Sequence, residues 1–181
     1  MKMAKKFLAV ALAGVLALSV LTGCGNSANT KSIAEAMSDI SKAAGITFKE
    51  DTKLNTKAKA IAEALAGDAD TEALADNEEQ EAEKEKIMTI MGDSYKEQFV
   101  WLSVTETKGY NATAQAASLL DGMDEGKVNV PTDKEPANTR FIGTTTVTQD
   151  GITYRVAVIT AAPKAEQTPG GGESTDQGSK E

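Results

Sequence analysis

The stretch RFIGTTTVTQDGITYRVAVIT, residues 140–160, decides the fold, because two long β-forming runs flank the pair Asp150-Gly151. Asp-Gly between such runs is a strong signal for a two-residue type I′ turn. We therefore predict a β-hairpin in which Gln149 pairs with Ile152, and this pairing fixes the register of both strands.

The predicted register gives the hairpin two different faces. The mainly apolar face carries the pairs Val147–Tyr154, Thr145–Val156, Gly143–Val158 and Phe141–Thr160. The more polar face carries Thr148–Thr153, Thr146–Arg155 and Thr144–Ala157. We expect the apolar face to point into the core and Arg155 to be exposed on the polar face.

A further strand is predicted over residues 98–105, and a short one over residues 127–130. In the first of these, Phe99 and Trp101 alternate with Val100, Leu102 and Val104, so both faces are apolar. This pattern predicts an interior strand that is covered on both sides. We interpret Trp101 as a core residue rather than as a platform for a ligand.

Four helices are predicted around these strands. Ser32 and Glu35 form a capping box that opens the first helix, which Gly45 ends. Residues 46–55 are expected to be extended or loop. Further helices are predicted from Asn55 or Thr56 to Gly67, through an acidic segment to Gly92, and from Asn111 to Gly122.

The order of these elements predicts an α+β fold. Several N-terminal helices would pack on a small, mostly antiparallel sheet that closes with the C-terminal hairpin. This order is similar to that of secreted CAP-type domains, but the histidines expected in that family's cavity are missing, so no site residues are transferred. We predict a single domain over residues 32–161 and a disordered tail over residues 162–181, which is rich in Gly, Pro and polar residues.

The N-terminus has the features of an export signal. Lys2, Lys5 and Lys6 precede an uncharged apolar run over residues 7–21. As a helix the run would be roughly 22 Å long, short of the roughly 30 Å hydrocarbon core of a bilayer. It fits the apolar region of a cleaved signal peptide better than a permanent membrane span.

Leu21-Thr22-Gly23-Cys24 follows this run and resembles the lipobox of bacterial lipoproteins. The resemblance covers residues 1–25 and implies cleavage between Gly23 and Cys24. It also implies that the Cys24 thiol carries a diacylglyceryl anchor, with residues 24–31 as a tether. The protein would then be lipid-anchored to a cell membrane and face away from the cytoplasm. The alternative is an ordinary secretory signal that happens to contain a cysteine.

Composition excludes several kinds of chemistry. The chain has no histidine, and Cys24 is its one cysteine, which excludes a Ser-His-Asp triad, a Cys-His dyad and a His-ligated zinc site. There is no Ser-x-x-Lys pair and no Walker A loop. Loss of Lys2, Lys5 and Lys6 with the signal would leave 16 basic and 27 acidic residues, a net charge of −11, which disfavours nucleic acid as a partner.

The acidic residues between positions 68 and 85 leave a calcium site open as an alternative. Their spacing does not fit an EF-hand loop, so we interpret this segment as a solvated helix or loop. We predict no catalytic residues, no metal site and no cofactor.

The function expected from the sequence is that of a non-catalytic surface lipoprotein that binds a protein or envelope component. Two alternatives stay open: a binding or sensor module for a small molecule or metal ion, and a hydrolase of the envelope that uses a pair of carboxylates.

Overall fold

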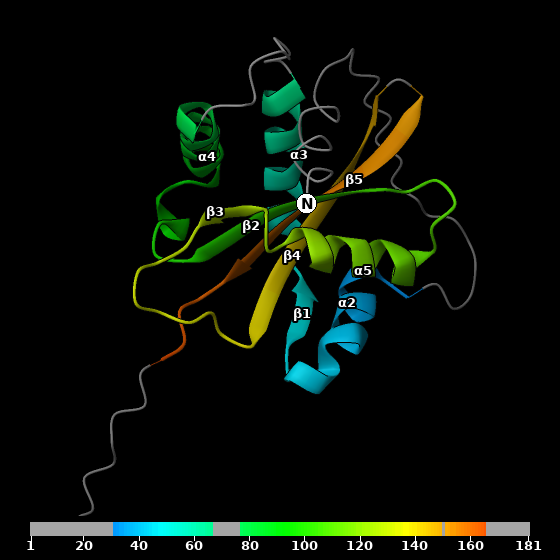
Figure 1. Ribbon diagram of the computed structural model, residues 1–181, viewed down its shortest axis with the longest axis horizontal. Helices are drawn as coiled ribbons and strands as arrows, with labels where there is room; N and C mark the ends of the chain where they lie inside the picture. Colours follow the sequence, from blue (N-terminus) through cyan, green and yellow to red (C-terminus); the bar gives the residue numbers. More distant parts are fainter. Residues whose placement is uncertain (1–30, 67–76, 150, 166–181) are drawn as a thin grey trace, which may run out of the picture.

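A computed structural model describes residues 31–66, 77–149 and 151–165 and has three layers, with a central sheet between two pairs of helices. Figure 1 shows α3 (Thr52–Ala66) and α4 (Asn77–Met91) toward the top of the view, and α2 (Ile33–Ser41) and α5 (Ala112–Gly122) toward the lower right; the two pairs cover opposite faces of the sheet. Short 3₁₀ helices, Lys42–Ala44 and Asp93–Tyr95, follow α2 and α4. The predicted α+β class is confirmed.

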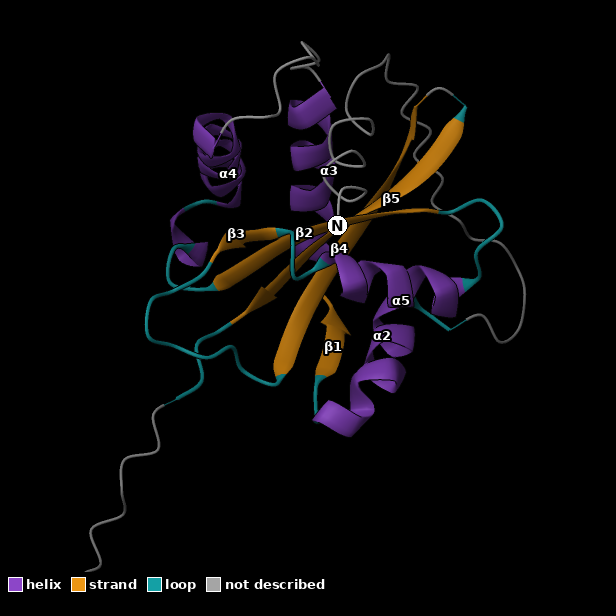
Figure 2. Cartoon of the chain, viewed as in Figure 1, coloured by secondary structure: helices purple, strands orange, loops and turns teal. Residues whose placement is uncertain are grey.

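The sheet has five strands in the order β1-β4-β5-β2-β3 (Figure 2). The strands are β1 (Thr47–Glu50), β2 (Phe99–Glu106), β3 (Lys127–Asn129), β4 (Thr139–Gln149) and β5 (Ile152–Ala161). Only the β1–β4 pair is parallel among them. The sheet is therefore mixed and mostly antiparallel, with the hairpin strands β4 and β5 at its centre.

The predicted hairpin register is confirmed. Gln149 pairs with Ile152, and every pair that follows from this, down to Phe141 and Thr160, is present. Gly151 has a φ of 77°, which glycine adopts without strain. The short connection leaves β4 and β5 aligned along their whole length, as the sequence pattern requires.

Each face of the sheet has its own hydrophobic core. Under α3 and α4 the core contains the predicted apolar hairpin face, including Val147, Tyr154, Val156 and Val158. Under α2 and α5 a second core contains Phe48, Phe99, Trp101, Met123, Ile142, Ala157 and Ile159. The expectation that Arg155 is exposed is wrong, because α5 covers part of the more polar hairpin face.

The helix termini confirm two predicted caps. Ser32 and Glu35 form the capping box of α2, and the Asn111 side chain accepts a hydrogen bond from Ala114 N at the start of α5. Gly45 ends the first helical segment in the left-handed conformation, as predicted. At the other end of α5, however, the helix continues through Gly122.

The predicted start of the second helix is wrong. The helix α3 begins at Thr52, and Asp51 lies at its N-cap, where its Oδ1 accepts a hydrogen bond from Lys53 N at 2.8 Å. Asn55 lies inside the first turns of α3, and its Oδ1 instead accepts a hydrogen bond from Thr144 N at 2.7 Å. The strand β1 occupies part of the segment that we expected to be extended or loop.

The predicted C-terminal tail begins too early. Ala162 and Lys164 are bonded to the loop before β4, through Ala137 N to Ala162 O at 2.8 Å and Lys164 N to Glu135 O at 2.7 Å. Pro163 forms a bridge with Pro136. The ordered domain therefore extends a few residues past β5.

Candidate functional site

A pocket of about 370 Å³ opens at the end of the sheet on the α2 and α5 side. Its walls come from the end of α2, the segment before β1, strands β2 and β4, the end of α5 and the loops around β3. The lining residues are Ser41, Ile46, Phe99, Trp101, Leu120, Met123, Asp124, Lys127, Val130, Pro136 and Arg140. Most are apolar, and three are charged.

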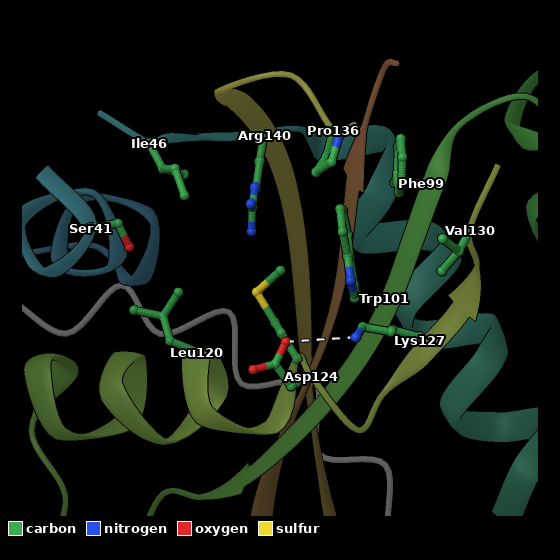
Figure 3. A pocket seen from close by; sticks show the side chains of 11 residues that line it. Ser41, Ile46, Phe99, Trp101, Leu120, Asp124, Lys127, Val130, Pro136 and Arg140 are labelled. Atoms are coloured by element: carbon green, nitrogen blue, oxygen red, sulfur yellow. Dashed lines mark ion pairs between the residues drawn. The ribbon is translucent and has the colours of Figure 1, made fainter. Parts of the chain in front are cut away.

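Arg140 is the polar centre of this pocket. Figure 3 shows its side chain pointing from β4 into the space between Ile46 and Trp101. Its Nε atom is buried and has no hydrogen-bond partner among the described residues. A buried donor without an acceptor is uncommon in folded proteins, so this atom marks a place where the fold leaves hydrogen-bonding capacity unused.

Aromatic rings flank the Arg140 guanidinium. Its Cζ lies 5.1 Å from the centroid of the Trp101 ring and 5.8 Å from that of Phe48. Both distances are within the range of cation–π interactions. Trp101 is itself stacked on Phe99, with ring centroids 5.7 Å apart. The aromatic residues therefore hold the guanidinium in place without satisfying its N–H groups.

Phe48 is positioned by α2. The Ser38 hydroxyl of α2 accepts a hydrogen bond from Phe48 N at 2.8 Å, and its one proton is shared between Ala34 O at 2.8 Å and Phe48 O at 3.1 Å. These bonds occupy the outer edge of β1 and fix the strand against the helix. The ring of Phe48 is buried in the core beside Arg140.

The other two charged residues of the pocket pair with each other. Asp124 Oδ1 lies 3.8 Å from Lys127 Nζ (Figure 3). Burial lowers the pKa of Arg140 and the nearby Asp124 carboxylate raises it, and an arginine still remains charged at neutral pH. The pocket thus carries two positive charges and one negative charge.

Arg155, the second of the two arginines in the chain, provides a contrast on the same side of the sheet. Its Nε donates to Gln115 Oε1 at 2.8 Å, and its Nη1 donates to Thr144 Oγ1 at 3.2 Å. Gln115 is held in turn by a bond to Tyr110 O. Arg155 is a satisfied structural residue, whereas the Nε of Arg140 is not satisfied.

The predicted lipid attachment at Cys24 and the cleavage between Gly23 and Cys24 lie outside the described residues. The first half of the acidic segment, residues 68–76, lies outside them as well, and its second half lies in α4. In the described part of the chain, no group of three His, Cys, Asp or Glu side chains is placed to hold a metal ion. Trp101 is buried in the core, as predicted, and it also borders the pocket.

Sequence reasoning missed Arg140. No motif surrounds it, and the pocket joins segments that are up to about a hundred positions apart. One signal was present: Arg140 shares a hairpin face with Ile142 and Thr144 and points into a covered layer of the sheet. A cation in such a position needs a partner, and the hairpin itself offers none.

No helix in the part of the chain that the structure describes is long and apolar enough to cross a membrane. No protein-family model, no curated protein and no solved structure matches this sequence.

Proposed function

We propose that this protein is a lipid-anchored binding module on the outer face of a bacterial membrane. The support for the anchor is the N-terminal pattern of charged, apolar and lipobox residues that ends at Cys24. Two acyl chains on Cys24 would hold the domain stably, since each buried CH₂ contributes about 0.8 kcal/mol. The first helix, α2, is capped by Ser32, eight positions after Cys24, so the domain would lie close to the membrane surface.

The pocket around Arg140 supports a binding role. Its volume of about 370 Å³ lies within the range of small-molecule sites, and its lining combines apolar walls with few polar groups. The observation that carries the proposal is the buried Arg140 Nε without an acceptor. Among the described residues the Arg140 guanidinium has no hydrogen-bond acceptor, and a ligand in the pocket would supply one to its terminal N–H groups, since Nε itself is enclosed by the protein.

The same pocket favours binding over hydrolysis by two carboxylates. Such a mechanism needs one carboxyl group as an acid and a second as a base or nucleophile on either side of the scissile bond. Among the described residues, Asp124 is the one acid that lines the pocket, and it is paired with Lys127. We therefore assign the domain a non-catalytic role.

Metabolic labelling tests the anchor. The full chain, expressed in a bacterium with labelled palmitate, should incorporate the label and enter the detergent phase. A Cys24→Ala variant should lose the label, and a Ser27→Ala variant in the tether should keep it. Label that persists without Cys24, or a wild-type chain that never acquires label, would contradict the proposal.

Fluorescence tests the pocket. Trp101 is the single tryptophan of the chain and lines the pocket, so its emission reports on occupancy. Anionic, cationic and neutral compounds of about ten non-hydrogen atoms would be screened against the full chain. Compounds that shift the emission should lose their effect in Ile46→Phe, which fills the pocket, and keep it in Ile152→Phe at the distant end of the hairpin. If no compound shifts the Trp101 emission, or if the shift is the same in Ile46→Phe as in the wild type, this pocket is not the binding site.

A further inference from the structure

We infer that the Arg140 pocket binds a small organic carboxylate that has an apolar body. The inference rests on the proposed function, in which this pocket is the binding site, and adds the chemical class of the ligand. Three properties of the pocket carry it: the free donors of Arg140, the charge balance of the lining, and the apolar walls.

In the part of the chain that the structure describes, the N–H donors of Arg140 have no hydrogen-bond acceptor. Among the described residues no carboxylate oxygen lies within 4.0 Å of its guanidinium, and the buried Nε has no partner of any kind. All N–H groups of a guanidinium lie in its plane, and the neighbouring aromatic rings offer them no oxygen acceptor. A planar carboxylate matches this edge with two parallel N–H···O bonds.

The charge of the pocket selects an anion. Asp124 and Lys127 neutralise each other across 3.8 Å, which leaves Arg140 as the uncompensated charge. Because Arg140 is half-buried between Phe48 and Trp101, its field is less screened than that of a surface cation. A ligand with a single negative charge would restore neutrality.

The walls of the pocket select an apolar body attached to that anion. Ile46, Phe99, Leu120, Met123 and Val130 contribute most of the remaining lining. At about 30 Å³ for each water-sized group, the volume has room for about ten to twelve non-hydrogen atoms. Inorganic phosphate would satisfy Arg140 but would leave these walls in contact with water, so a carboxylate with an aryl or short alkyl group fits better.

Titration of three probes against the full chain in nonionic detergent tests the inference. The probes are 3-phenylpropionate, its neutral amide 3-phenylpropionamide, and inorganic phosphate, at pH 7 and constant ionic strength. Trp101 emission gives the dissociation constant of each. We expect 3-phenylpropionate to saturate the signal and to bind at least tenfold more tightly than the amide or phosphate.

Two variants locate the interaction on Arg140. Arg140→Gln removes the charge and the paired donors and should weaken 3-phenylpropionate at least tenfold. Arg140→Lys keeps the charge without the planar fork and should bind with intermediate affinity. Lys134→Gln removes an exposed cation outside the pocket lining and should change affinity less than threefold. Thermal unfolding by circular dichroism confirms that each variant is folded.

The outcomes separate the ligand class from the site. If the amide binds as tightly as the acid, or if Arg140→Gln retains full affinity for the acid, the carboxylate inference is wrong while the pocket stands. Equal losses of affinity in Arg140→Gln and Lys134→Gln would show that the ligand is held by general charge attraction, and this would also overturn the inference. If Ile46→Phe leaves the response to every probe unchanged, the proposed site fails together with the inference.

Discussion

Gly143 in β4 lies directly beneath the backbone of Leu54 in α3. A Cβ atom built on Gly143 would lie 2.1 Å from the carbonyl carbon of Leu54 and 2.3 Å from Asn55 N. The missing side chain therefore allows α3 to sit on the centre of the sheet. Leu54, Ala58 and Ile61 are fully buried as a consequence, and the stripe of small and medium side chains on α3 matches this close approach.

Gly143→Ala should destabilise the domain by about 3 kcal/mol or more, because the new methyl group meets backbone that cannot rotate away. In an ordinary strand, replacing glycine by alanine stabilises the protein by about 0.5–1 kcal/mol. A loss of stability would therefore show that α3 packs directly against Gly143. Urea unfolding followed by Trp101 fluorescence measures it. Gly151→Ala is the control: it has open space but a φ of 77°, and should cost about 1–2 kcal/mol. A smaller loss at Gly143 than at Gly151 would contradict the packing of α3.

The side chain of Asn55 ties α3 to β4 where β1 has ended. The last β1–β4 pair is Glu50 with Ile142, so Thr144 N has no strand partner on that side and donates to Asn55 Oδ1 instead. Asn55→Ala should cost about 1 kcal/mol, since it leaves this donor unpaired. Thr56→Ala, at the next exposed position of the same helix, should stay within about 0.5 kcal/mol of wild type. If Asn55→Ala and Thr56→Ala shift the denaturation midpoint equally, the hydrogen bond from Thr144 N to Asn55 Oδ1 does not contribute to stability.

The hairpin was predictable because its information is local. Turn chemistry at Gly151 and the apolar alternation around Val147 and Val156 specify one register, and no distant residue is needed. The strand β1 was not predictable as such: it has four residues, buries only Phe48 among them, and pairs in parallel with a strand about ninety positions later. The cap at Asp51 was missed because Asn55 has the right side chain for a cap, and only the β4 backbone reveals its actual partner.

The pocket depends on non-local packing in the same way. Arg140 meets Phe48 and Trp101 only after β1, β2 and β4 have assembled into one sheet. The alternation of β2 correctly assigned Trp101 to a buried face, but Arg140 and Phe48 were not singled out from the sequence. Nothing in the sequence indicated that Arg140 and Trp101 would lie together, since no spacing rule links positions on separate strands.

Val156→Asp should cost several kcal/mol, enough to unfold a domain of ordinary stability. Val156 is 4% exposed in the core under α3, and an aspartate there would be a buried charge with no partner. Ile152→Asp, at a position on β5 that is 37% exposed, should cost less than about 1 kcal/mol. Circular dichroism would record the two melts. A stable Val156→Asp protein would contradict the burial of Val156 in the core under α3.

Asp124→Asn should strengthen the binding of 3-phenylpropionate by about threefold. The Asp124 carboxylate lies near enough to Arg140 to raise its pKa, so it also repels a ligand anion. It is largely exposed, which limits the gain to the roughly 0.5–1 kcal/mol of a surface charge. Asp121→Asn, on the same segment but outside the pocket lining, should leave affinity unchanged. Weaker binding in Asp124→Asn would show that Asp124 assists the ligand rather than opposing it.

Replacement by methionine should leave the stability of the domain nearly unchanged at Arg140 and should lower it at Arg155. In Arg140→Met the loss of cation–π contacts, about 0.5–2 kcal/mol, is offset by removal of a buried donor that costs about 1–3 kcal/mol when unpaired. The free energy of unfolding should therefore change by less than about 1 kcal/mol. Arg155→Met instead leaves the buried Gln115 Oε1 without its donor and should cost about 2 kcal/mol.

Urea denaturation of both variants without ligand makes the comparison. If Arg140→Met is as damaging as Arg155→Met, Arg140 is a structural residue and the case for a ligand beside it is lost. If Arg140→Met is neutral or stabilising, the fold does not need the charge, and a binding role explains a cation whose Nε lacks any partner in the described chain.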